Sequence, residues 1–122
     1  MVITGIFIPY NNNIPCSIIK LDRDSSFFIK QLHDLIGCEI CDFITITTNL
    51  FNKRCLIIDD NGKLVPNWAL RINTRASFFY NVTTKSIDPI VGNAILFDVS
   101  DCDLVSIMCP ETTVDILNEY GV

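Results

Sequence analysis

Long apolar runs are missing from this 122-residue chain, although 49% of its residues are hydrophobic. None of its apolar stretches approaches the roughly 20 residues that a helix needs to cross a bilayer. The opening segment, residues 1–8, has neither the basic flank nor the cleavage site of a secretory signal peptide. We therefore expect a cytoplasmic protein that has no membrane partner.

Basic residues are also few, and they do not cluster. Nine lysines and arginines stand against fourteen aspartates and glutamates, which gives a net charge of −5. Nonspecific nucleic-acid binding gains its affinity from neutralising phosphates. The charge balance therefore argues against a nucleic-acid partner.

Histidine occurs once, at His33. A Ser-His-Asp or Cys-His nucleophile system would have to use it, yet its neighbours Lys30, Gln31 and Asp34 are the polar residues of a solvent-facing helix side. The chain contains neither a nucleophile elbow nor a catalytic cysteine signature. We expect no enzyme activity, no catalytic residue and no cofactor.

The apolar pattern predicts a single α+β domain over residues 1–122, with a mostly antiparallel sheet. The main helix is expected at 24–36, capped by Asp24 or Ser25, with Phe28, Leu32, Leu35 and Ile36 inward and Gly37 at its end. Strands are expected at 3–8, 16–21, 43–48 and 54–59, the first two forming a hairpin. The tripeptide 60–62 predicts a turn that needs positive φ.

The second half of the chain is expected to be extended, apart from its end. We predict extended structure over 64–76 and 78–82, and strands at 90–99 and 104–108. Pro110 suits the first position of a helix, so a short C-terminal helix is expected with Val114, Leu117 and Tyr120 on one side and Gly121 at its end.

Six cysteines invite a disulfide or metal interpretation. Most are expected to be buried free thiols, because disulfide frameworks belong to smaller secreted chains. Cys38 and Cys41 have the spacing of a zinc or redox pair, and His33 and Cys55 complete a four-ligand set on paper. A structural zinc site shows two tight ligand pairs, and the second pair is missing here. Packing thiols are the preferred interpretation, so no metal is expected.

The segment 67–75 carries an alternating pattern of hydrogen-bond donors. If it is extended, one face presents Asn67, Arg71, Asn73 and Arg75, and the other presents Trp68, Leu70, Ile72 and Thr74. Guanidinium groups match carboxylates and phosphates bidentately. These four residues are the candidate ligand-binding residues, for a small anionic ligand such as a nucleotide; a solvated strand face is the alternative.

Four sequence blocks, read in order, carry a family resemblance. They are Ile36-Gly37, then Asp59-Asp60-Asn61-Gly62-Lys63-Leu64, then Pro66-Asn67-Trp68-Ala69, and finally Asp88-Pro89-Ile90-Val91-Gly92-Asn93-Ala94. With them, the run from 35 to 97 resembles a small family of unknown function. That family is found mainly in phages, Gram-positive mobile elements and some large DNA viruses. The resemblance implies a mobile-element or viral origin, with Gly92 turning the backbone before an apolar strand.

These observations together predict a small non-enzymatic binding protein of phage or viral origin. Its expected partner is a host protein, met in the host cytoplasm, with interference in host defence as one possible outcome. A small anionic ligand is the alternative, and a zinc or thiol-redox protein is a more distant one. A homodimer is also plausible, because edge strands of small sheets invite pairing.

Overall fold

The computed structural model describes residues 1–47, 53–85 and 87–120 and confirms the α+β class. The strands are β1 (Val2–Ile8), β2 (Ser17–Asp22), β3 (Cys41–Thr47), β4 (Lys53–Asp59), β5 (Ala94–Ser100) and β6 (Asp103–Val105). The helices are α1 (Phe28–Ile36), α2 (Thr74–Thr84) and α3 (Pro110–Tyr120), with short 3-10 turns η1 (Gly62–Leu64) and η2 (Trp68–Arg71). Of these helices, none within the described ranges combines the length and apolar character that a bilayer crossing requires.

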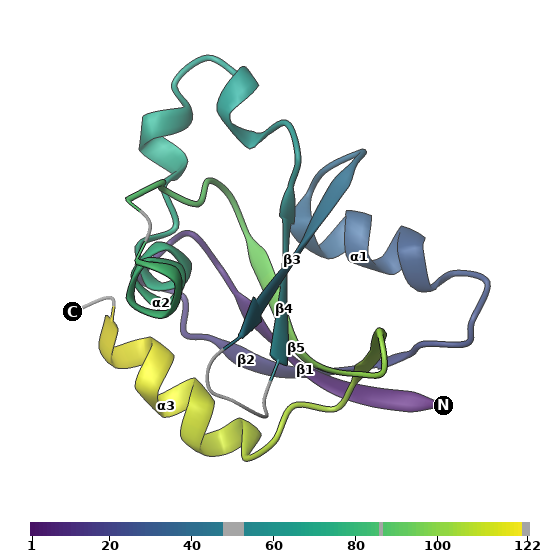
Figure 1. The fold of residues 1–122 in the computed structure, drawn as a ribbon. Coiled ribbons are helices and arrows are strands. Elements are labelled where there is room, and N and C mark those ends of the chain that lie inside the picture. The colour runs from purple at the N-terminus through teal and green to yellow at the C-terminus, as the bar shows by residue number, and fades with distance from the viewer. Residues whose placement is uncertain (48–52, 86, 121–122) are drawn as a thin grey trace.

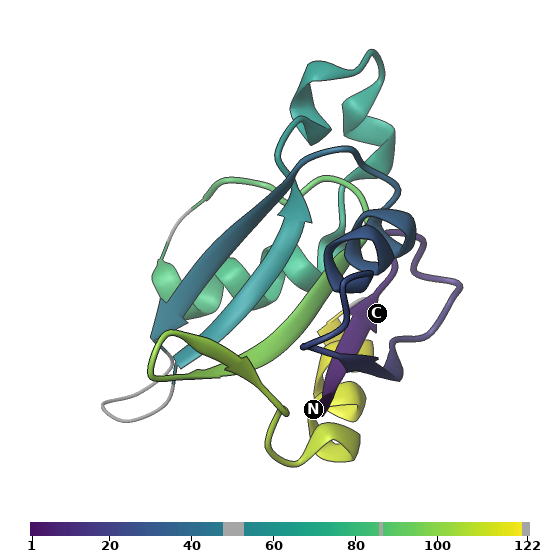
Figure 2. The same ribbon diagram turned by 90° about the vertical axis from the view of Figure 1, so that its right-hand side faces the viewer.

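The strands form one antiparallel sheet in the order β2-β1-β5-β4-β3, and β6 pairs with β5 beside this path. The expected hairpin of β1 and β2 is confirmed, and β3 pairs with β4 as a second hairpin. Strand β5 comes from far along the chain and lies between the two hairpins (Figure 1). The border of the sheet beyond β4 is therefore β3, as Figure 2 shows.

Helix α1 covers one face of the sheet, and Phe28, Leu32 and Ile36 are its buried residues. They pack with alternate residues of the central strands, among them Ile57, Ile95 and Phe97. Leu35 packs against this cluster from a partly buried position. Gly37 ends the helix in the left-handed conformation, at φ 80°, as the sequence predicts.

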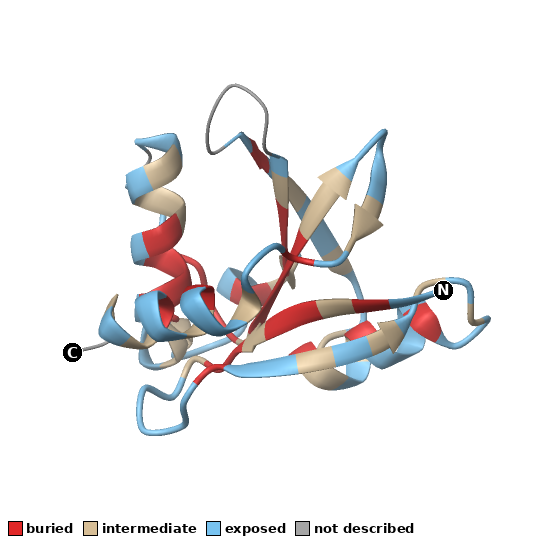
Figure 3. Cartoon of the chain, turned by 90° about the horizontal axis from the view of Figure 1, so that it is seen from below, coloured by how far each residue is buried: buried red, intermediate tan, exposed pale blue. Residues whose placement is uncertain are grey.

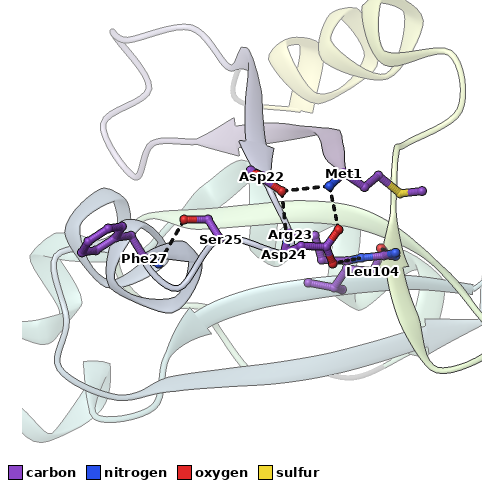
Figure 4. A network of polar contacts seen from close by, with 7 residues as sticks. All are labelled: Met1, Asp22, Arg23, Asp24, Ser25, Phe27 and Leu104. Carbon is purple, nitrogen blue, oxygen red and sulfur yellow. Dashed lines mark hydrogen bonds and ion pairs between the residues drawn. The ribbon is translucent and has the colours of Figure 1, made fainter.

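The predicted start of this helix is wrong by four residues. Helix α1 begins at Phe28, and Phe27 at its N-cap has no side-chain capping bond. The Asp24 carboxylate instead accepts a 2.6 Å bond from the Met1 ammonium, which also donates to Asp22 at 2.9 Å (Figure 4). Ser25 Oγ accepts from the Phe27 N–H at 3.1 Å within a turn. The two expected caps are thus used one turn before the helix.

Helices α2 and α3 cover the opposite face (Figure 1). They share a core with the other side of the central strands, in which Ile6, Leu56, Leu96 and Leu117 are buried. Figure 3 shows the buried residues gathering in the middle of the sheet. In α3, Leu117 is buried while Val114 and Tyr120 pack against the same core, as the sequence predicts. Residue 121 lies outside the described residues.

The expectation of extended structure over 64–76 and 78–82 is wrong. The chain forms the two 3-10 turns and then α2 through this region. Helix α2 is rich in β-branched and aromatic residues, which favour strands when considered locally. It is helical because Asn73 caps it and because Ala76 and Phe79 are buried against the sheet. Tertiary packing has overridden local preference.

Three smaller predictions also need correction. The 60–62 turn does not use positive φ: Asn61 has φ −106°, and a Cβ at Gly62 would lie 3.1 Å from the Val91 carbonyl oxygen, which is a tight contact. The predicted strand 90–99 begins only at Ala94, since Gly92 turns the backbone at φ 86°. The predicted strand 104–108 shortens to β6, which ends at Val105.

Candidate functional site

The four predicted ligand-binding residues do not share a strand face. Asn67 precedes η2 with φ 62°, Arg71 ends η2, Asn73 caps α2 and Arg75 lies in its first turn. The alternation that placed them in one row assumed extended backbone, which the 3-10 turn and the helix replace. Each side chain therefore has surroundings of its own.

Arg75 is 1% exposed and acts as an internal anchor. Its Nη2 donates to the carbonyl oxygens of Pro9 at 2.7 Å, Asn11 at 3.2 Å and Ile14 at 2.7 Å. Its Nη1 donates to Asn118 Oδ1 at 3.1 Å. Buried polar groups are usually hydrogen-bonded, and here both Nη atoms are bonded while Nε has no hydrogen-bond partner among the described residues. The two Nη groups of this side chain are therefore occupied within the fold.

Asn73 is fully buried and is used equally inside the fold. Its Oδ1 accepts from the Ala76 N–H at 3.0 Å, which caps α2. Its Nδ2 donates to the Ile8 carbonyl at 2.8 Å and to the Gly92 carbonyl at 2.9 Å. Asparagine is a preferred N-cap residue, which is the one sequence signal for this role, because Ala76 stands where a capping box would have Glu or Gln.

Arg71 is the second arginine among the four predicted ligand-binding residues. Its guanidinium carbon lies 5.4 Å from the centroid of the Tyr10 ring, which is within the range of a cation–π contact. Its side chain also approaches Gly92 closely enough that a Cβ at that glycine would lie 3.3 Å from Nη2. With Asn73 and Arg75 bonded internally, the anionic-ligand interpretation loses the convergence of donors on which it depended.

The cysteines divide into three environments. Cys16 and Cys55 are buried, Cys38 and Cys41 are half-buried, and Cys102 and Cys109 are exposed; all six are free thiols. The expectation that most are buried is therefore wrong, because two of the six are buried. Among the described residues, no three histidine, cysteine, aspartate or glutamate side chains are placed to hold a metal ion. The four-ligand zinc site considered from the sequence, with His33, Cys38, Cys41 and Cys55, is therefore not formed.

Cys38 and Cys41 are nevertheless neighbours, with their Sγ atoms 3.5 Å apart. Burial raises the pKa of the Cys41 thiol to about 12, helped by the bond to Cys38 and by the negative charge of Asp59. Burial also raises the pKa of the Cys38 thiol, and Asp59 adds to the effect. A thiol acts as a nucleophile only as the thiolate. This pair is therefore a weak nucleophile at neutral pH.

Strand β3 is one of the two border strands of the sheet. No strand in the described part of the chain pairs with it on the side away from β4. The Asp60 N–H donates to the Ile40 carbonyl at 3.0 Å, which extends the β3–β4 register by one pair. Bonded and non-bonded pairs alternate along an antiparallel ladder. Phe43 and Thr45 therefore direct their backbone N–H and C=O groups outward, away from β4.

Two hollows flank this edge, one on each face of the sheet. The first, of about 370 Å³, lies on the α2 side and receives Asp42 and Ile44 of β3. Its other charged lining residues are Asp59, Asp60, Lys63 and Asp88, so acidic residues outnumber basic ones. The first hollow is therefore acidic on balance.

The second hollow, of about 820 Å³, lies on the α1 side of the sheet. Its apolar lining comes from Phe43 of β3, from Cys55, and from Val99, Cys102 and Leu104 near the β5–β6 turn, and its polar lining comes from Thr45, Lys53, Ser100 and Asp101. Phe43 is 42% exposed, which is high for so large an apolar side chain. The two hollows thus differ in charge: the first is acidic on balance, and the second combines apolar side chains with one lysine and one aspartate.

Comparison of the chain with protein-family models, with curated protein sequences and with solved structures finds no match.

Proposed function

We propose that this chain is a small non-enzymatic binding protein of phage or viral origin that captures an extended segment of a host protein as an added strand on β3. The observation that carries the proposal is the open edge of β3, with outward backbone groups at Phe43 and Thr45. Strand addition gains affinity from main-chain hydrogen bonds and specificity from pockets for alternate side chains. The origin rests on the resemblance of the sequence blocks alone.

The two edges of the sheet differ in a way that favours β3 as the docking strand. Natural edge strands avoid unwanted pairing through charges, especially lysine, and through prolines. Strand β2, at the other border, contains Lys20 and Asp22 and follows Pro15. Strand β3 has one charged residue, Asp42, and its remaining sequence is β-branched or aromatic apart from Cys41. Its edge lacks that protection.

The flanking hollows specify the chemistry of the captured segment. Side chains of an added strand alternate between the two faces, as those of β3 do. On the α2 side they would meet Asp42 and the acidic hollow, where a lysine or arginine is complementary. On the α1 side they would lie beside Phe43 and the second hollow, where an apolar side chain is complementary. The expected partner segment therefore alternates basic and apolar residues.

The test uses a displayed library of host-derived peptides of about nine residues, long enough to span β3. Selected peptides are then titrated against the wild-type chain and against Thr45→Pro. Proline removes one outward N–H and is tolerated on edge strands when that N–H faces solvent. We expect Thr45→Pro to raise the Kd for the selected peptides about tenfold or more, because one backbone hydrogen bond to the peptide is lost. A tenfold change in Kd corresponds to about 1.4 kcal/mol, which is the size of such a loss.

Thr45→Val is the matched control, because it keeps the backbone N–H and changes only the exposed side chain. It should bind the selected peptides nearly as well as the wild type. Equal binding by all three proteins would place the peptide elsewhere and refute the edge as the site. Sedimentation velocity is run beside the titration. Self-association that is lost in Thr45→Pro would make a second copy of this chain the occupant instead.

A further inference from the structure

Cys38 and Cys41 belong to a connection that is fixed at both ends. On the helix side, the N–H groups of Gly37 and Cys38 donate to the His33 carbonyl at 2.8 Å and 3.1 Å. On the sheet side, the Ile40 carbonyl accepts the 3.0 Å bond from Asp60. The two thiols are therefore held near each other by backbone contacts that do not involve sulfur. The 3.5 Å between the Sγ atoms follows from this arrangement.

We propose that Cys38 and Cys41 form a reversible intramolecular disulfide, with a low-molecular-weight disulfide such as oxidised glutathione as the oxidant. One protein thiolate attacks the oxidant, forms a mixed disulfide and releases the first small thiol. The second protein thiolate then attacks the protein sulfur of that mixed disulfide and releases the second small thiol. The two cysteines lose two electrons and two protons in total, and the oxidant becomes two thiols.

Closure of this bond needs little movement. The S–S bond is about 2.05 Å long, so the two sulfur atoms must approach by about 1.5 Å from their 3.5 Å separation. Holding two reacting groups together greatly raises their effective concentration over that of an external thiol. Attack of the second protein thiolate on the mixed disulfide should therefore be faster than attack by free glutathione. The mixed disulfide should not accumulate.

The electrostatics of the pair favour the disulfide at equilibrium. A redox pair becomes a strong oxidant when its reduced form is stabilised as a thiolate. Here burial and the Asp59 carboxylate raise the pKa of both thiols, so the thiolate is disfavoured. The pair also follows the carboxyl end of α1, where the helix dipole disfavours negative charge. This arrangement fits a slowly formed, persistent modification and differs from the activated thiol of an oxidoreductase.

The other cysteines provide a contrast within the same chain. Cys16 and Cys55 are buried, which limits access by the oxidant, and Cys102 and Cys109 are exposed. Exposed thiols accept glutathione, and without a neighbouring thiol they retain it. The proposed pair should therefore differ from the exposed cysteines in releasing both glutathione molecules when it is oxidised. A disulfide at this position would join the end of α1 to the first residue of β3.

The experiment uses the full chain in a Cys102→Ser and Cys109→Ser background, incubated with oxidised glutathione at mildly alkaline pH. Reaction is stopped with acid, remaining thiols are alkylated, and the protein is examined by intact mass and peptide mapping. We expect loss of two hydrogen atoms, about 2 Da, with no retained glutathione and a linkage between Cys38 and Cys41. Dithiothreitol should restore the original mass, and the oxidised chain should melt at a higher temperature.

Two controls make each outcome decisive. Cys38→Ser in the same background should retain one glutathione at Cys41 or remain unmodified, and it should never lose the two hydrogens. The urea-unfolded chain, treated in parallel, shows that the oxidant is active. The proposal is overturned if the folded chain keeps a stable glutathione adduct on either cysteine. It is equally overturned if both thiols stay free for alkylation while those of the unfolded chain are oxidised.

Discussion

Arg75 and Asn118 meet between α2 and α3, where Arg75 Nη1 donates to Asn118 Oδ1 at 3.1 Å. The same Asn118 oxygen accepts a 2.9 Å bond from the N–H of Cys16, the residue before β2. The guanidinium also bonds three carbonyls of the loop that precedes Cys16. These contacts join two helices to the β1–β2 connection, so Arg75 supports the fold.

Replacement of this arginine should therefore be costly. Arg75→Lys keeps the charge but cannot reach several acceptors with a planar fork. Buried carbonyls left without a donor cost about 1–3 kcal/mol each, so we expect a loss of about 3 kcal/mol in the free energy of unfolding, measured by urea denaturation. Arg71→Lys is the control and should cost less than about 1 kcal/mol, because it weakens only a cation–π contact. Equal losses in the two variants would contradict the anchoring role.

Even a substitution of Asn73 that preserves the capping bond to Ala76 should destabilise the protein. Asn73→Asp keeps an oxygen for the Ala76 N–H but loses the two donors to the Ile8 and Gly92 carbonyls. Asn73→Ala loses all three bonds. Both variants should lose about 3 kcal/mol in the free energy of unfolding, because a buried carboxylate facing two carbonyls is unfavourable. Recovery of wild-type stability in Asn73→Asp would mean that capping alone explains this residue.

The sequence was informative wherever structure depends on nearby residues. The apolar spacing of α1, its Gly37 terminus, the strands β3 and β4, and Pro110 at the start of α3 were all predictable. These features rest on periodicity and on single-residue backbone preferences. They give the α+β class and most of the strands.

The structure of residues 64–84 could not be predicted, because it depends on residues that are distant in the sequence. Its helix is fixed by contacts with distant residues: Asn73 with Ile8, Ser77 with Ile90, and Arg75 with Asn118. Local composition indicated strands, and the alternating donor row followed from that error. The role of β3 as a border strand could not be predicted for a similar reason. Strand β3 was predicted, but its place at the border depends on β5 inserting between β1 and β4.

Cys55 should make the protein sensitive to alkali. The residue is 2% exposed, and burial raises the pKa of its thiol from 9.0 to about 11, with a smaller contribution from Asp42. A group whose pKa is raised by folding stabilises the protein fully below its unfolded pKa. That stabilisation is lost as pH rises from about 9 to about 11, and it amounts to on the order of 2 kcal/mol.

Urea denaturation at a series of pH values from neutral to about 11 measures this loss. Cys55→Ala should show a smaller decline in stability over the same interval, although its stability at neutral pH falls because a buried sulfur is removed. Cys102→Ala, at an exposed position, controls for the loss of a thiol as such. If Cys55→Ala and the wild type decline in parallel above pH 9, titration of Cys55 is not the cause.

Asp59 should control the reactivity of the thiol pair. Its negative charge raises the pKa of both Cys38 and Cys41, so its neutralisation should lower both pKa values and increase the thiolate fraction at a fixed pH. Asp59→Asn is suitable because its side-chain oxygen can still accept the 2.9 Å bond from the Asn61 N–H. In the Cys102→Ser and Cys109→Ser background, we expect iodoacetamide to alkylate both thiols faster in this variant at mildly alkaline pH.

The matched control is Asp60→Asn, the neighbouring carboxylate, which is exposed and does not contribute to the pKa of either thiol. It should leave the alkylation rates unchanged. In all variants the rates should rise about tenfold per pH unit while the thiolate is the minor form, because only the thiolate reacts. Peptide mapping separates the two cysteines. An unchanged rate in Asp59→Asn would show that burial alone sets the thiol pKa values. A similar increase in both variants would show that the effect comes from the net charge of this end of the sheet and not from the position of Asp59.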